Sequence, residues 1–260
     1  MLTGEGRVGE TGIEAAALKP AECDVSRAGA LPVDTVAIDY EGHEHVPDAE
    51  TLAALADEVQ VRLTTPVRAD GFDPLGDDGI DERIPDAVER VLVAGHPAYL
   101  DEDERARPVA PRLGAAAERH PGAWVGTESV ERVALATGCT QFELLARSTE
   151  RELRALRAAG HDGPLAVYAP TVLTGDDDAI LDAVGGYVAR RGPVADALPA
   201  GAATDATATG RARDVLRSAA EDYALVGSTD AVRRRVDALK TAGADVVVGY
   251  PARGLAEFLG

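Results

Sequence analysis

The chain alternates short β-prone runs with longer amphipathic segments, and this alternation constrains its fold more than any other feature. The runs are almost continuously apolar, as expected of strands that are buried on both faces of a parallel sheet. They cover Ile13–Lys19, Thr35–Tyr40, Val59–Thr65, Arg90–His96, Ala123–Thr127, Gln141–Arg147, Leu165–Tyr168 and Asp245–Tyr250. Helical patterns lie between them, at Ala49–Ala56, Asp101–Arg119, Glu128–Ala136, Thr149–Ala159 and Ala179–Arg190. This order is typical of a parallel α/β fold.

Eight such strands within 260 residues predict a (β/α)8 TIM barrel in a single domain that spans residues 1–260. A doubly wound open sheet is the competing fold, but the sequence lacks the glycine-rich dinucleotide fingerprint of many such sheets. About 75 residues separate the seventh strand from the eighth, too many for one crossover. This interval predicts extra helices, including Arg211–Tyr223 and Thr229–Ala242. Its stretch 192–210 is rich in Ala, Thr and Gly and predicts a flexible low-complexity surface loop.

The chain is strongly acidic, with 26 Lys and Arg against 45 Asp and Glu and a formal net charge of −19. Such a field repels phosphate backbones and anionic lipids, so neither nucleic acids nor membranes are expected partners. Acid excess, scarce lysine and 4% aromatic residues resemble proteins of salt-accumulating halophiles, and we expect a halophilic archaeon as the source. The net charge then reflects the solvent rather than the substrate.

The sequence shows no export signal and no membrane span. The N-terminus lacks a basic start followed by an apolar run. No apolar stretch has the roughly 18 residues that a span needs. Cys23 and Cys139 form neither a disulfide framework nor a zinc motif. We therefore expect a cytoplasmic protein.

The carboxyl ends of the predicted strands supply the candidate site residues, because chemistry in TIM barrels takes place at that face. Lys19 follows the first strand in a chain with only two lysines. It can form a Schiff base, neutralise a phosphate, or pair with Glu22 or Asp24. The other strand ends offer the polar groups of Asp39, Tyr40, Thr64, Thr65, Arg68, His96, Thr127, Arg147, Tyr168, Tyr250 and Arg253.

Two histidines after the second strand allow a metal site. His43 and His45 lie two residues apart, so in an extended segment they share a side and can chelate a metal. With Asp39 and His96 they would form the ligand set of a metal-dependent hydrolase that uses zinc or manganese. Solvated loop histidines are the alternative, and we assign no metal ligand.

The turn at Gly126–Ser129 joins a predicted strand to a helix. Free N–H groups at a helix start, with the hydroxyls of Thr127 and Ser129 beside them, can hold a phosphate. The same residue types also suit an ordinary helix N-cap.

The C-terminal third carries the most specific pattern. The stretch VGSTDAV (226–232) precedes a helix, and AGAD (242–245) precedes the last strand. This arrangement resembles the closing segment of the bacterial luciferase-like flavin and deazaflavin oxidoreductases, whose barrels also carry extra helices before the last strand. The chain is identified as a divergent, shortened member of this superfamily, which includes the coenzyme F420-dependent oxidoreductases. The family's glycine-rich segment after the third strand is replaced here by an acidic loop over 68–90.

The resemblance implies roles for individual residues. Asp39 and Tyr40 would lie beside the cofactor ring, with Thr65 and Val67 behind it. Gly126, Thr127 and Ser129 would hold the cofactor phosphate. The strand ends leave Lys19, Arg147, Tyr168 and Tyr250 as substrate-binding candidates.

The resulting hypothesis is hydride transfer between coenzyme F420 or FMN and an unidentified small molecule. Asp39, His43 or His96 would handle the accompanying proton. Two alternatives stay open: a non-catalytic luciferase-like barrel that has lost its cofactor, and the metal-dependent hydrolase described above. The family resemblance also suggests a homodimer.

Overall fold

The computed structural model describes residues 7–259, in which nine strands form one sheet. They are β1 (Ala15–Leu18), β2 (Thr35–Ile38), β3 (Gln60–Pro66), β4 (Glu89–Val93), β5 (Trp124–Gly126), β6 (Thr140–Leu144), β7 (Leu165–Val172), β8 (Leu225–Val226) and β9 (Val246–Pro251). Their hydrogen-bonded order is β6-β5-β4-β3-β2-β1-β9-β7-β8, and a further pairing of β6 with β7 closes the sheet. Since β8 is a two-residue strand at the edge of β7, eight strands form the closed part. The predicted (β/α)8 barrel is confirmed.

The helices are found largely where the apolar periodicity predicts them. They are α1 (Ala49–Ala56), α2 (Glu102–Ala106), α3 (Val109–Arg119), α4 (Glu131–Ala136), α5 (Thr149–Ala158), α6 (Asp177–Ala189), α7 (Gly192–Ala197), α8 (Gly210–Tyr223), α9 (Thr229–Ala242) and α10 (Ala256–Leu259). Short 3-10 helices are η1 (Arg7–Thr11), η2 (Val25–Ala30), η3 (His43–His45), η4 (Asp81–Arg83) and η5 (Pro97–Tyr99). Within residues 7–259, no helix is both long and apolar enough to cross a membrane.

One predicted helix, Asp101–Arg119, is divided into α2 and α3. The break falls at Arg107, whose backbone is extended (φ −67°, ψ 136°), and at Pro108, the N-cap of α3. Proline has no N–H to donate, and its ring disfavours the helical conformation of the residue before it. The prediction of one continuous helix was wrong for this reason.

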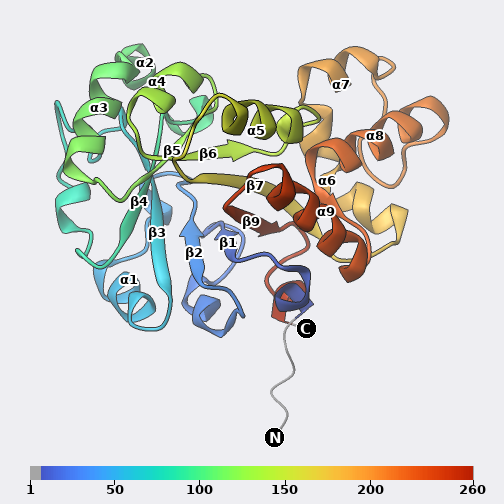
Figure 1. Ribbon diagram of the computed structural model, residues 1–260, viewed down its shortest axis with the longest axis horizontal. Helices are drawn as coiled ribbons and strands as arrows, with labels where there is room; N and C mark the ends of the chain where they lie inside the picture. The colour runs from blue at the N-terminus through green and yellow to red at the C-terminus, as the bar shows by residue number, and fades with distance from the viewer. Residues whose placement is uncertain (1–6, 260) are drawn as a thin grey trace, which may run out of the picture. The chain divides into compact units, whose positions relative to one another are not determined.

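The chain divides into two compact units, and both contribute strands to the sheet. Within residues 7–259, the first unit comprises Ala15–Glu143 and His161–Ala166, and the second comprises 7–14, Leu144–Gly160 and 167–259. In the first unit, α1 lies against β3 and α3 against β4 (Figure 1). Leu92 and Val125 pack against Leu113 of α3, so these two strand residues face the helices. Their neighbours Val91 and Trp124 face the other side of the sheet, because strand side chains alternate.

The second unit contains the extra helices between β7 and β9. Helices α6 and α8 pack together, and α7 lies next to them (Figure 1). The segment 192–210 was expected to be too poor in apolar residues to pack. Instead, its residues 192–197 form α7, and Val194 and Ala208 are buried in a cluster with Leu181 and Leu216. Leu198 and Ala202 pack against the same cluster, and these few apolar side chains are enough because α6 and α8 provide the rest of it.

Candidate functional site

Three polar side chains lie in a row at the carboxyl ends of β1, β2 and β3. The parallel register of these strands places Lys19, Asp39 and Thr64 opposite one another. The backbone continues this register beyond the strand end, since the N–H of Asp39 donates to the carbonyl of Leu18 at 2.8 Å. By strand alternation, the row occupies the sheet face opposite to α3. We call Lys19, Asp39 and Thr64 the Asp39 row.

Asp39 is a partly buried carboxyl with an altered acidity. Its Oδ1 accepts a hydrogen bond from the hydroxyl of Thr64 at 3.3 Å. Desolvation raises the pKa of Asp39 from 3.8 to about 7, although Lys19 and Thr64 both oppose the rise. The carboxylates of Glu41 and Glu22 add to it. A carboxyl group that titrates near neutrality can both give and accept a proton at physiological pH.

Lys19 pairs with Glu22, which is one of the partners that the sequence suggested. The distance from Nζ of Lys19 to Oε1 of Glu22 is 3.1 Å. The other suggested partner, Asp24, instead caps η2, and its Oδ1 accepts from the N–H of Ser26. The lysine side chain is 30% exposed, so this ion pair contributes about 1 kcal/mol or less. The positive charge of Lys19 still lowers the pKa of Asp39.

An aromatic cluster adjoins the Asp39 row. The ring of Tyr40 lies edge-to-face with His43, Phe72 and Tyr99, at centroid distances of 5.8, 5.7 and 6.3 Å. Burial, followed by the charge of Glu104, raises the pKa of Tyr40 to about 12, so the phenol stays neutral. Tyr99 remains 40% exposed. Burial raises the pKa of Tyr99 and the charge of Asp39 adds to the rise, so this exposed ring offers aromatic surface close to the Asp39 carboxyl.

The histidines do not converge on a common point. His43 donates from Nε2 to the carbonyl of Asp70 at 2.7 Å, and Nδ1 of His96 accepts a backbone N–H two residues ahead. His45 lies 3.9 Å from the exposed carboxylate of Glu44. Across residues 7–259, no three His, Cys, Asp or Glu side chains are grouped to hold a metal ion. The ligand set that a metal-dependent hydrolase would need is therefore not formed among the described residues.

Thr65 and Val67 lie on the helix-facing side of β3 and its extension. The hydroxyl of Thr65 donates to the carbonyl of Leu63, and the side chain is almost fully buried. Val67 is fully buried in the cluster with Leu92 and Leu113. Strand alternation explains this placement, since Thr64 points to the opposite face. The resemblance implies that both residues lie behind the cofactor ring, whereas their side chains face the helices and not the Asp39 row.

The candidate phosphate residues follow β5. The N–H of Thr127 donates to the carbonyl of Phe142 at 3.1 Å, and its hydroxyl donates to the same oxygen at 3.5 Å. Ser129 is exposed, with a left-handed backbone (φ 66°), and the short helix α4 begins only at Glu131. A Cβ on Gly126 would come within 2.9 Å of Val93. Thr127 thus has no free donor for a phosphate.

The remaining substrate-binding candidates belong to the second unit. Arg147 is exposed and follows β6. Tyr168 was expected at a strand end, but β7 continues to Val172, so this tyrosine lies in mid-strand. Its ring stacks on Tyr250 of β9, with centroids 6.5 Å apart and an interplanar angle of 18°.

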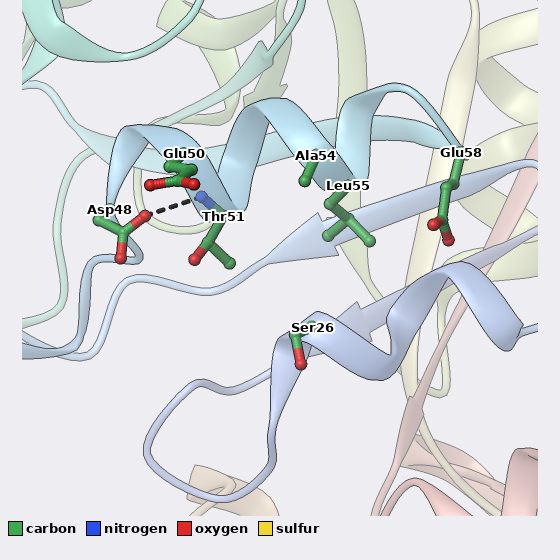
Figure 2. Close-up of a pocket in the computed structure, with 7 residues that line it drawn as sticks. All are labelled: Ser26, Asp48, Glu50, Thr51, Ala54, Leu55 and Glu58. Carbon is green, nitrogen blue, oxygen red and sulfur yellow. Dashed lines mark hydrogen bonds between the residues drawn. The ribbon is translucent and has the colours of Figure 1, made fainter.

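One hollow of the first unit, of about 320 Å³, adjoins His43, and its lining also includes Asp70, Asp77 and Arg83. Figure 2 shows another, between η2 and α1. There, Asp48 caps α1 by accepting the N–H of Thr51 at 2.7 Å. No residue of the Asp39 row lines either hollow.

Three members of the site were not assigned a role from the sequence: Thr64, Phe72 and Tyr99. Thr64 was named among the strand-end residues without a role. Alternation puts it on the sheet face opposite to Thr65, but its pairing with Asp39 depends on the register of β2 and β3. Phe72 lies in the loop after β3 and Tyr99 in η5 after β4, and no periodic pattern predicts which residues of such connections pack near the sheet.

Comparison with known proteins supports the fold. A family model described as "Family of unknown function (DUF7388)" matches residues 8–258. No curated protein matches the sequence. Among solved structures, an F420-dependent secondary alcohol dehydrogenase in complex with an F420-acetone adduct is similar with a TM-score of 0.59 and 11% identity. That alignment covers 93% of this chain and 94% of the dehydrogenase.

Two further structures are similar over nearly their whole length. The coenzyme F420 dependent tetrahydromethanopterin reductase from Methanopyrus kandleri has a TM-score of 0.60 and 14% identity, covering 95% of this chain and 96% of the reductase. The monooxygenase RslO1 from Streptomyces bottropensis has a TM-score of 0.51 and 19% identity, covering 95% of each chain. At these identities the likeness shows a shared barrel fold.

Proposed function

The chain belongs to the DUF7388 family of unknown function, and from that premise we propose that it is a luciferase-like oxidoreductase. Its reaction would transfer a hydride between coenzyme F420 or FMN and a small molecule. The observation that carries the proposal is Asp39, a carboxyl that titrates near neutrality at the carboxyl end of a barrel strand. The fold shared with two F420-dependent enzymes supports it.

The chemistry assigns separate tasks to the neighbouring side chains. Reduction of a carbonyl or imine places negative charge on its oxygen or nitrogen, and a positioned acid must supply a proton there. A bound deazaflavin or flavin supplies or accepts the hydride. Asp39 gives the proton during reduction and takes it back during oxidation. Lys19 favours the carboxylate that remains after the proton has left.

The aromatic cluster fits the ring of such a cofactor. Tyr40 and Phe72 are buried, so the exposed tyrosine ring of the cluster is that of Tyr99, and aromatic rings pack well against a planar heterocycle. Because the pKa of Tyr40 is raised to about 12, this phenol adds no negative charge to the cluster. The fit is confined to the ring end of the cofactor, since the candidate phosphate residues offer no free donor at Thr127.

The test is a binding titration with F420 and with FMN in high salt. Trp124 is the only tryptophan and faces the same side of the sheet as the Asp39 row. A chromophore bound there accepts its excitation energy, so we expect saturable quenching of Trp124 emission together with a rise in melting temperature. Quenching that grows linearly with ligand concentration, without a thermal shift, would overturn the proposal.

A pH series locates the bound ring relative to Asp39. If the ring lies beside this carboxyl, the dissociation constant changes between pH 6 and pH 8, because binding and protonation are linked. The ligand itself can also titrate, as the phosphate of FMN does at about pH 6, so the contribution of Asp39 is the difference in pH dependence between the wild type and Asp39→Asn, whose side chain does not titrate. The same pH dependence in both proteins would place the ligand elsewhere.

One observation favours a cofactor-free barrel as the second candidate. Both donors of Thr127 are bonded to Phe142, at the position where the resemblance places the cofactor phosphate. In that case neither F420 nor FMN gives a saturable signal. The barrel would then act as a binding protein, and a thermal-shift screen of small carbonyl compounds and amines is the next measurement.

A further inference from the structure

Asp39 lies between two different kinds of partner in the Asp39 row. The hydroxyl of Thr64 on β3 contacts it directly at 3.3 Å, and the register places Lys19 on its other side, after β1. The charged and titratable groups that act on it from the surrounding segments are Lys19, Glu22, Glu41 and Tyr99. Only Lys19 is cationic among them, and it is shared with Glu22.

The two oxygens of the Asp39 carboxyl are not equivalent. Oδ1 accepts the hydrogen bond from Thr64. Oδ2 has no hydrogen-bond partner among residues 7–259. A hydroxyl donor on one oxygen stabilises the ionised form and restricts rotation of the carboxyl group, so the other oxygen becomes the site of protonation.

We propose that Thr64 is a positioning residue for Asp39: its hydroxyl orients the carboxyl group through Oδ1 and leaves Oδ2 to exchange the proton. The inference deepens the proposed function, on which the use of that proton rests. The hydrogen bond between Thr64 and Asp39 is present in the protein without any cofactor. A titration of the free protein therefore tests Thr64 independently of cofactor binding.

The chain provides a matched control in the next residue. Thr65 has the same side chain on the same strand but faces the helices, where it donates to the carbonyl of Leu63 at 3.1 Å. Replacing either threonine with valine removes one hydroxyl and keeps the β-branched shape. Only Thr64→Val removes a hydrogen bond to Asp39.

The experiment follows the side-chain carboxyl carbons of ¹³C-labelled aspartate by NMR across the pH range. The resonance of Asp39 is the one missing from Asp39→Asn. We expect Thr64→Val to raise its midpoint by about one pH unit, because a hydrogen bond to an ionised group is lost. Thr65→Val should leave the midpoint in place, and Thr64→Ser, which keeps a hydroxyl, should restore it.

Charge variants give predictions of opposite sign. Lys19→Met should raise the midpoint of Asp39, and Glu41→Gln should lower it, because the first removes a nearby cation and the second a nearby anion. The inference is overturned if Thr64→Val titrates like Thr65→Val, or if Thr64→Ser shifts the midpoint as far as Thr64→Val. Should Thr64→Val not fold, the comparison of Thr64→Ser with Thr64→Ala decides in the same way.

Discussion

At the scale of a residue, Asp39 should make the free energy of unfolding depend on pH. Its pKa is about 7 in the folded protein and 3.8 as an ordinary aspartate. Between these values the folded state holds the proton more tightly than the unfolded chain, so stability is lost as the pH rises through this window. The loss amounts to at most about 4 kcal/mol at pH 8. Asp39→Asn does not titrate, so it should gain stability relative to the wild type between pH 4 and pH 8.

Urea unfolding at several pH values measures this difference. The matched control is Asp34→Asn, at the exposed amino end of the same strand. The prediction fails if the free-energy difference between Asp39→Asn and wild type is the same at pH 4 and pH 8. A difference of the opposite sign would mean that Asp39 is ionised and well paired in the folded state.

The site residues show what a single sequence can predict at this scale. The apolar run of the second strand located Asp39 and Tyr40 at a strand end, and the resemblance implied that they lie beside the cofactor ring. The same resemblance implied that Thr65 and Val67 lie behind that ring, but strand alternation turns both side chains toward the helices. The role of Thr64 depends on the register between strands, which hydrogen bonding in the folded sheet determines and no local pattern encodes.

At the scale of an element, two adjacent glycines in α6 should respond oppositely to the same substitution. A Cβ on Gly185 would overlap the backbone carbonyl of Thr204, in the segment 192–210. A Cβ on Gly186 would lie 4.0 Å from the nearest atom, the hydroxyl of Thr204. We expect Gly185→Ala to destabilise the protein by about 1–3 kcal/mol through overpacking. Gly186→Ala should stabilise it by up to about 1 kcal/mol through helix propensity.

Thermal or urea unfolding of the two variants distinguishes a packed segment from a mobile one. If 192–210 moved freely, its backbone would withdraw and Gly185→Ala would be as stable as Gly186→Ala. The low-complexity composition predicts a mobile segment, whereas the buried positions of Val194 and Ala208 predict a segment that stays packed against α6. The composition of 192–210 could not predict this packing, because the apolar partners of the segment come from α6 and α8. Helices such as α1 and α9 were predicted closely, since their own periodicity defines them.

At the scale of the whole molecule, the net charge of −19 should make stability depend on salt. The structure contains many arginine–carboxylate pairs, but most have at least one exposed partner, and pairs in which both partners are exposed, such as Arg233 with Asp230, contribute little. The excess of carboxylates therefore dominates, and their mutual repulsion extends over about 10 Å at 0.1 M salt but only about 3 Å at 1 M. Screening should stabilise the folded chain.

We expect the melting temperature to rise by about 3–8 °C between dilute buffer and molar potassium chloride, which corresponds to about 1–2 kcal/mol for a chain of this size. Sucrose at equal osmolality is the control, because it strengthens burial without screening charge. If sucrose reproduced the whole rise, the effect would come from solute exclusion. Screening also weakens the attraction within the exposed ion pairs. An unchanged melting temperature in potassium chloride would mean that this loss of stability equals the gain from weaker repulsion between the excess carboxylates. The halophilic interpretation of the composition would then have to be abandoned.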